Sequence, residues 1–223
     1  MKGLIYRNIQ INKKNIILAV MVMVFIFKIM VDSEISSYKE QLLLINVYTF
    51  VGMVVIYAVA EYVFKPDAVT KWQVFLHATP VTKKVIVGEK YLFDYIFLVI
   101  GAVLSTLMII VYTIKDGGEV SYNCFWGIAC AVSLILGNSA IHKILVSLMG
   151  EKCANIFSVV FVVAVLAILV VISVFSYTQL GAEFHCANTS YTSMLMCIVL
   201  LFGISVHVGS FFICVKIYNP YLE

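Results

Sequence analysis

The sequence is poor in charge and in proline. Of its 223 residues 12% are charged and 63% are hydrophobic, whereas a soluble domain has about 25% charged residues. The three prolines, Pro66, Pro80 and Pro220, lie outside the long apolar runs. This composition excludes an ordinary soluble enzyme. Because a membrane-spanning helix needs about 20 apolar residues, the hydrophobic residues suffice for about six crossings and leave no room for a separate soluble domain.

Motifs for catalysis, for metal binding and for nucleotide binding are also lacking. The sequence contains no G-x-x-x-x-G-K-[ST] loop and no H-E-x-x-H. The cysteines form no C-x-x-C pair, which argues against a disulfide framework; they are Cys124, Cys130, Cys153, Cys186, Cys197 and Cys214. The histidines fall in four different segments, so none pairs at metal-ligand spacing; they are His77, His142, His185 and His207. No basic tract suggests a nucleic-acid partner. We therefore expect no catalytic site, no metal site and no cofactor on this chain.

What the sequence does have is a series of long apolar runs separated by polar loops. Because these runs are apolar on all sides and long, they favour helices over the short alternating strands of a membrane barrel. The sequence predicts an all-α polytopic membrane protein, one transmembrane domain over residues 1–223. We expect six transmembrane helices, at Ile16–Val31, Leu42–Phe64, Tyr91–Ile114, Tyr122–Met149, Ile156–Phe175 and Met194–Tyr218.

Lysine and arginine gather on one side of this predicted topology. They precede the first span, fill the loop between spans two and three, border the loop between spans four and five, and lie at the end of span six, whereas the alternate loops hold only Lys39 and Lys115. The positive-inside rule then places both termini in the cytoplasm. The alternate loops, including the outer loop at residues 176–193, are acidic. That acidity would attract a cationic substrate, although exclusion of lysine alone also explains it.

Residues 1–15 alternate apolar and basic side chains, with Leu4, Ile5 and Ile9 against Arg7 and Lys13. This pattern predicts an amphipathic helix that lies on the membrane surface and precedes the first span.

The charges near the span ends form possible pairs one helical turn apart. The expected interfacial ion pairs are Glu61 with Lys65, Lys90 with Asp94, and Lys28 with Asp32. Because each residue lies near a span end, we interpret the pairs as structural and expect no deep carboxylate for a proton relay.

The loop at residues 65–90 contains a compact apolar pattern. Val69, Trp72 and Phe75, together with Leu76 and Thr79, fall on one face of a predicted amphipathic helix at residues 67–79. Pro66 and Asp67 suit its start and Pro80 its end. Such a helix either dips into the lipid interface or fills a groove on a partner protein, and the pattern alone favours neither.

Three cytoplasmic segments resemble a known family. The loop, with Asp67, Lys71-Trp72, Phe75 and then PVTKKVIVGEKY from Pro80, is similar to the D...KW..(Y/F)...LPV(S/T)(R/K)..IV..KY loop of small bacterial ABC exporter permeases. Met149-Gly150-Glu151-Lys152 resembles the G-x-(E/K)-K element before their fifth span, and MKGLIYRNIQINKKN resembles their MKGLxxKDxxxxKK opening. The size and layout are most similar to permeases of the phenol-soluble modulin exporter and of lantibiotic immunity.

Both Gly-Glu-Lys triplets, at residues 88–90 and 150–152, stand before predicted spans. Glycine permits a turn, glutamate suits a helix N-terminus and lysine reaches the headgroups, so we interpret both triplets as helix starts.

The resemblance implies a permease that is not itself an enzyme, with ATP and magnesium on a separate cytoplasmic ATPase. It implies that the residues 67–79 helix is a coupling helix seated on that ATPase, with Val69, Trp72, Phe75, Leu76, His77 and Pro80 as the contact residues. The expected partners are the ATPase, a second permease in a dimer (a copy of this chain in preference to a different permease), membrane lipid and an amphipathic peptide cargo, all at the bacterial plasma membrane. The alternatives are an ion-driven secondary transporter and a non-transporting scaffold or sensor.

Overall fold

A computed structural model describes residues 2–32, 38–69, 82–115, 122–150, 152–161, 163–164 and 189–217. The regular elements in these ranges are helices: α1 (Lys2–Asp32), α2 (Tyr38–Val69), α4 (Lys83–Lys115), the short 3-10 helix η1 (Tyr122–Phe125), α5 (Trp126–Met149) and α7 (Thr189–Ile217). A further helical segment, Lys152–Phe161, follows α5. The predicted all-α fold is confirmed for the described part of the chain.

Four helices are long and apolar enough to cross a membrane. Their apolar stretches are Gln41–Ala58, Lys83–Lys115, Trp126–Met149 and Ser193–Ile217. The first and fifth predicted spans correspond to shorter apolar helical stretches, Val20–Ile29 and Lys152–Phe161. The described residues therefore support a polytopic membrane protein, and six spans remain a prediction.

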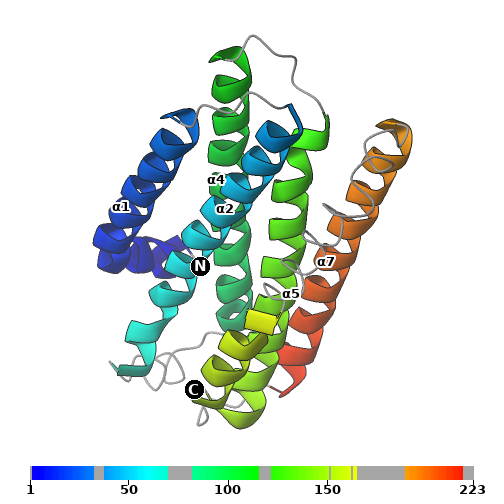
Figure 1. Cartoon of the computed structure of the whole chain (residues 1–223). Helices are drawn as coiled ribbons and strands as arrows, with labels where there is room; N and C mark the ends of the chain where they lie inside the picture. Colours follow the sequence, from blue (N-terminus) through cyan, green and yellow to red (C-terminus); the bar gives the residue numbers. More distant parts are fainter. Residues whose placement is uncertain are drawn as a thin grey trace.

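Several predicted boundaries differ from the structure. The predicted surface helix at residues 1–15 and the first span form one element, α1, whose first turns run across the direction of the rest of the helix (Figure 1). α7 begins at Thr189, so the last residues of the predicted outer loop are helical. α4 begins at Lys83, eight residues before the predicted span. Helices can extend beyond the apolar runs because the backbone N–H and C=O groups of polar residues pair within a helix as well as in a turn.

The two Gly-Glu-Lys triplets lie in different settings. Gly150 follows α5 with φ 86°, and its N–H donates to the carbonyl of Val146 at 3.1 Å, so it makes the turn that was predicted. This left-handed conformation is one that glycine adopts without penalty. Gly88, in contrast, lies inside α4, and its interpretation as a helix start was wrong.

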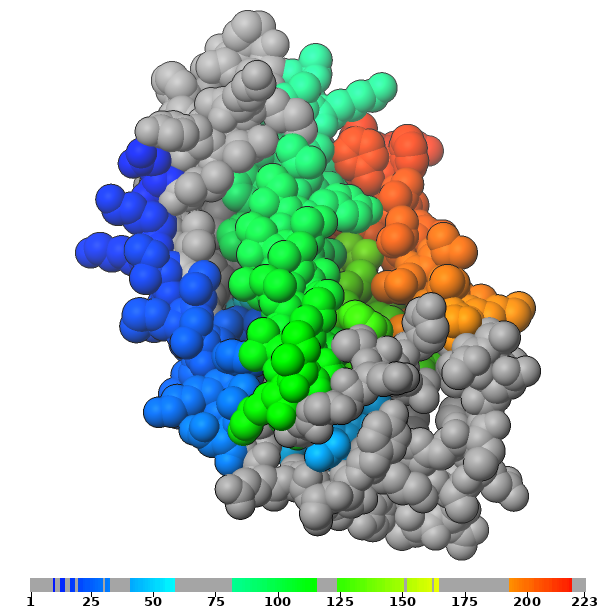
Figure 2. Space-filling model, turned by 90° about the horizontal axis from the view of Figure 1, so that it is seen from above, coloured from blue at the N-terminus to red at the C-terminus, as the bar shows by residue number. Residues whose placement is uncertain are grey.

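The helices alternate in direction along the chain (Figure 1). α2 packs against α1, α4 and α5, and the longest contact joins α5 to α7. α4 meets α5 and α7 over only a short stretch. On the face shown in Figure 2, α4 lies between α1 and α7. At one end of the bundle α4 begins, and α5 and α7 finish. We call it the basic end because exposed lysines lie there: Lys83, Lys84, Lys152 and Lys216.

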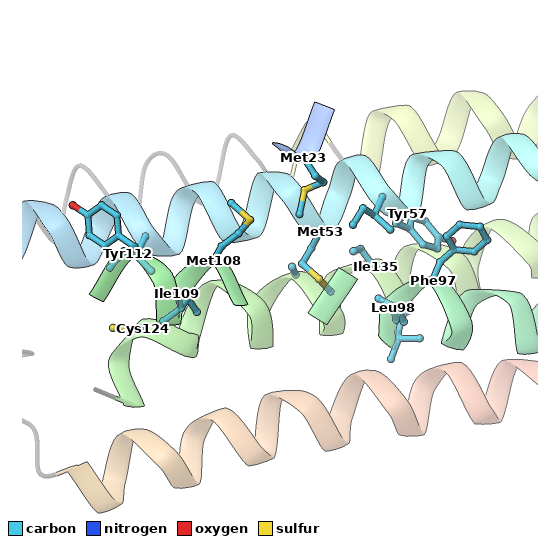
Figure 3. Close-up of a cluster of buried hydrophobic side chains, with 14 of the residues drawn as sticks. Met23, Met53, Tyr57, Phe97, Leu98, Met108, Ile109, Tyr112, Cys124 and Ile135 are labelled. Atoms are coloured by element: carbon cyan, nitrogen blue, oxygen red, sulfur yellow. The ribbon is translucent and has the colours of Figure 1, made fainter. Parts of the chain in front are cut away.

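The main apolar core lies between α1, α2, α4 and the first half of α5. α1 contributes Met23, α2 contributes Met53, and α4 contributes Phe97 and Ile109, all almost completely buried (Figure 3). The outward side chains of α4, such as Val99, are also apolar. A bundle that is apolar inside and outside is expected for helices surrounded by lipid.

A tight contact joins α2 to α5 at the end opposite the basic end. A Cβ atom on Gly127 would lie 2.2 Å from the backbone oxygen of Asn46, so only glycine fits there. The backbone N–H of Gly127 donates to Asn46 Oδ1 at 2.7 Å. The N-cap of α5, Phe125, makes no side-chain cap hydrogen bond. Asn46 therefore satisfies from a neighbouring helix a backbone donor that helix α5 leaves free.

Candidate functional site: a buried polar cluster between three helices

Most of the predicted coupling residues lie outside the described residues: Trp72, Phe75, Leu76, His77 and Pro80. Val69 is the last residue of α2, which runs through Pro66 and Asp67 without a break. The predicted helix start at residues 66–67 was therefore wrong, since those residues extend the second span. The coupling role of Trp72, Phe75, Leu76, His77 and Pro80 remains a prediction.

The predicted ion pairs have different outcomes. The side chains of Glu61 and Lys65 lie outside the described residues. Lys28 and Asp32 are both exposed near the end of α1, and their pairing stays a prediction. For Asp94, we expected a partner one turn back on its own helix. Its pairing with Lys90 stays a prediction, and the structure shows its carboxylate in contact with two other helices as well.

Asp94 lies in the first half of α4 and is 2% exposed. One of its oxygens, Oδ2, accepts from three donors: Ser139 Oγ at 2.5 Å and Lys143 Nζ, both on α5, and His207 Nε2 at 2.9 Å on α7. A buried carboxylate is stable only when it is paired and hydrogen-bonded. Asp94 is thus the point at which three helices meet.

Lys143 is held almost entirely by α4. Its ammonium group forms a salt bridge with Asp94, donates to the carbonyl of Lys90 at 3.2 Å and lies 4.3 Å from the ring centre of Tyr91. Its side chain is 13% exposed. The sequence placed Lys143 near the end of the predicted fourth span, and the structure shows its side chain directed from α5 into the bundle.

His207 completes the arrangement from α7 and is 0% exposed. Its Nδ1 lies 3.1 Å from the hydroxyl of Tyr95, and its ring lies against those of Tyr91 and Tyr95, at centroid distances of 4.6 and 5.1 Å. A neutral imidazole with its proton on Nε2 satisfies every partner, because Nε2–H donates to Asp94 while Nδ1 accepts from Tyr95. We assign this tautomer from the hydrogen-bond network.

Tyr91 seals the cluster toward the basic end. Its hydroxyl lies 2.9 Å from Ser210 Oγ and donates to Cys214 Sγ at 3.2 Å, both on α7. A small apolar group of Ile86, Val87, Tyr91 and Cys214 packs there. We refer to the polar set as the buried polar cluster: Tyr91, Asp94, Tyr95, Ser139, Lys143 and His207.

The chemistry of the cluster is that of a connector. It pairs one carboxylate with one ammonium group, and the imidazole links them to a tyrosine. Among the described residues, no group of three or more His, Cys, Asp or Glu side chains could hold a metal ion. Ionisable groups buried within membrane spans are functional suspects, and here their visible effect is to join α4 to α5 and α7.

A second polar contact joins α5 to the helical segment that follows it. Ser158 Oγ donates to Asn138 Oδ1 at 3.1 Å, and His142 Nε2 lies 3.1 Å from Asn155 Oδ1. Polar pairs of this kind hold helices together in lipid, where association gains little from the hydrophobic effect.

Sequence reasoning missed the cluster because its members come from three distant segments. One signal was available. Asp94, Lys143 and His207 each lie within about three turns of the same end of their helices in an antiparallel arrangement. This shared depth indicates that opposite charges could meet.

The comparisons with known proteins agree with a membrane permease. No curated protein and no solved structure matches the chain. Residues 3–219 match the family described as ABC-2 family transporter protein, which covers almost the whole chain. Members of this family are membrane components that are not themselves catalytic, and the family implies association with an ABC ATPase. The chain therefore belongs to the ABC-2 family of transporter proteins, as a membrane permease.

Proposed function

We propose that this chain is the membrane-spanning permease subunit of an ATP-driven exporter that moves amphipathic peptides out of a bacterial cell. The observation that carries the proposal is the family match over residues 3–219, together with the bundle of long apolar helices. The specific likeness to peptide exporters and lantibiotic-immunity permeases comes from the three cytoplasmic segments of the sequence and remains part of the proposal.

Energy for transport comes from a separate ATPase that binds ATP and magnesium. The permease sequence has no phosphate-binding loop of its own. Residues 67–80 dock on the ATPase through Trp72 and Phe75, and ATP-driven closure of two ATPases shifts two permeases between conformations. A second copy of this chain completes the transport path, since two-fold pairs are the commonest assemblies.

The charge distribution supports a cytoplasmic position for the basic end. Lys83 and Lys84 begin α4, Lys152 begins the segment after α5, and Lys216 lies near the end of α7; all four are exposed. By the positive-inside rule this end faces the cytoplasm of the plasma membrane. With α1 and the segment at Lys152–Phe161 counted as spans, the chain has six crossings and both termini inside.

An ion-driven secondary transporter is the second candidate, and the buried polar cluster favours it. We expected no deep carboxylate, whereas Asp94 is buried within the bundle. Intramembrane carboxylate and histidine groups are typical of proton pathways. Two observations argue against this candidate. The charge of Asp94 is already neutralised by Lys143. Secondary transporters have helices interrupted by glycine or proline near mid-span, whereas the prolines of this chain lie outside its apolar stretches.

The test is copurification from native membranes. The intact chain is expected to retain an ATPase whose hydrolysis in lipid rises when a cationic amphipathic peptide is added. The variant Trp72→Ala/Phe75→Ala is expected to lose that ATPase. The matched control is Phe202→Ala/Phe212→Ala, which removes two exposed aromatic side chains from α7 and leaves the ATPase bound. Absence of any ATPase from the intact chain would overturn the proposal.

A further inference from the structure

The contacts of α5 divide into an apolar half and a polar half. Its first half contributes Ala131, Ile135 and Leu136 to the main core shared with α2 and α4. Its second half contributes Ser139 and Lys143 to the buried polar cluster. The contact between α4 and the α5–α7 pair is therefore apolar toward one end and polar toward the basic end.

The two halves are fixed in different ways. At the end opposite the basic end, Gly127 touches the backbone of α2, and Asn46 caps it. The two backbones approach most closely at that point, beside the hydroxyl of Thr49, and the contact between α2 and α5 continues from there along both helices. Toward the basic end, α4 is joined to α5 and α7 by Asp94, with Lys143 and His207 as its partners.

We propose that the buried polar cluster is a latch, and that the Asn46–Gly127 contact is the pivot about which the α5–α7 pair swings away from α4 at the basic end. α5 and α7 move together because they share the most extensive contact in the bundle, whereas α4 makes only a small contact with each of them. The proposal rests on the proposed function, since it describes how the permease changes shape during transport.

The physics of ion pairs makes such a latch switchable. In the closed state the groups are dry, and three donors converge on one carboxylate oxygen, so the contact is strong and specific in direction. When the basic end opens, water reaches Asp94 and Lys143, and an ion pair in water is worth about 0–1 kcal/mol. Hydration of the same groups therefore offsets part of the contact that is lost in the open state. An apolar contact has no equivalent compensation.

The position of α4 connects the latch to the source of energy. α4 begins at Lys83, which follows Trp72 and Phe75 closely in the sequence, and its first turn is fixed by hydrogen bonds to the carbonyl of Thr82. Asp94 lies on the same helix, about three turns further on. A displacement of the segment proposed to dock on the ATPase would therefore reach the latch through one rigid element.

The experiment measures distances between spin labels in lipid nanodiscs, in a chain whose native cysteines are replaced. One label pair, at Lys84→Cys and Lys216→Cys, reports the separation of α4 from α7 at the basic end. The control pair, at Leu148→Cys and Lys216→Cys, reports α5 against α7. All three positions are exposed. Lys143→Met breaks the latch, and Lys143→Arg keeps the charge and the donors.

We expect Lys143→Met to at least double the share of a longer α4–α7 distance, and Lys143→Arg to leave the distribution as in the parent chain. The α5–α7 control distance is expected to remain single in every variant. An α4–α7 distribution that Lys143→Met leaves unchanged would overturn the latch. A control distance that broadens in Lys143→Met would also overturn it, because the lysine would then support the whole bundle rather than one contact.

These measurements need no ATPase, so they test the latch even where copurification fails. Where the ATPase is present, ATP with vanadate is expected to alter the α4–α7 distance and not the control. A complex that hydrolyses ATP with both distances constant would refute the latch while leaving the permease assignment intact.

Discussion

Removal of either charge from the buried polar cluster should destabilise the chain more than removal of both. In Asp94→Leu, Lys143 would keep a charge at a position where its side chain is 13% exposed and its main partner is gone. Breaking one partner of a buried pair costs about 3–5 kcal/mol. In Lys143→Met, Asp94 would be left with only neutral donors, and a similar loss is expected.

The double variant Asp94→Leu/Lys143→Met leaves no charge to desolvate. It still loses the hydrogen bonds of Ser139 and His207 to the carboxylate, which cost about 1–3 kcal/mol. The double variant should therefore be more stable than either single variant. The interaction free energy between the two sites should be at least about 2 kcal/mol, so that the double variant loses less stability than the sum of the two single losses.

Thermal unfolding in lipid nanodiscs, followed with a thiol-reactive dye, provides the assay. Cys124 and Cys214 are buried and react only on unfolding, whereas Cys153 is exposed beside Lys152 at the basic end and gives the initial signal. At about 2–4 °C per kcal/mol for a chain of this size, each single variant should lower Tm by about 6–20 °C. Single effects that simply add in the double variant would refute the reasoning.

Two further substitutions test the packing around the cluster. Gly127→Ala places a Cβ atom 2.2 Å from a backbone oxygen of α2 and should lower the free energy of unfolding by about 1–3 kcal/mol in the same melting assay. Gly137→Ala is its control, because a Cβ atom there meets nothing within 4 Å and should be neutral or stabilising by up to about 1 kcal/mol. Ser158→Ala removes the hydrogen bond between α5 and the segment that follows it and should cost about 0.6–2 kcal/mol. Ser205→Ala is its control, because that exposed hydroxyl bonds only within its own helix and its loss should change Tm little. Equal effects within either pair would contradict the packing described here.

The sequence predicted the helices well because their signal is local. Long apolar runs between polar loops suffice to place a membrane helix. The turn at Gly150 was predicted for a similar reason, since glycine is favoured wherever the backbone needs a positive φ. Helix ends were predicted less well. α4 begins before its apolar run and contains Gly88, because a helix can continue through polar residues at a membrane surface.

The buried polar cluster was not predicted because pairing inside a bundle depends on tertiary contacts. Along the chain, the nearest opposite charge to Asp94 is Lys90, one turn away, and that spacing suggested a local pair. In the folded bundle the carboxylate faces inward, where Lys143 and His207 reach it from other helices. Sequence spacing describes neighbours on one helix, and it contains little information about neighbours on two others.

Transport itself is the most direct test of the central claim, that this chain is an ATP-driven permease. Inside-out membrane vesicles containing the chain and its copurified ATPase should take up a labelled cationic amphipathic peptide only with ATP. Vanadate should stop the uptake, and ionophores that collapse ion gradients should leave it intact. Uptake that continues without ATP and stops when the ion gradient is collapsed would contradict the account and favour a secondary transporter.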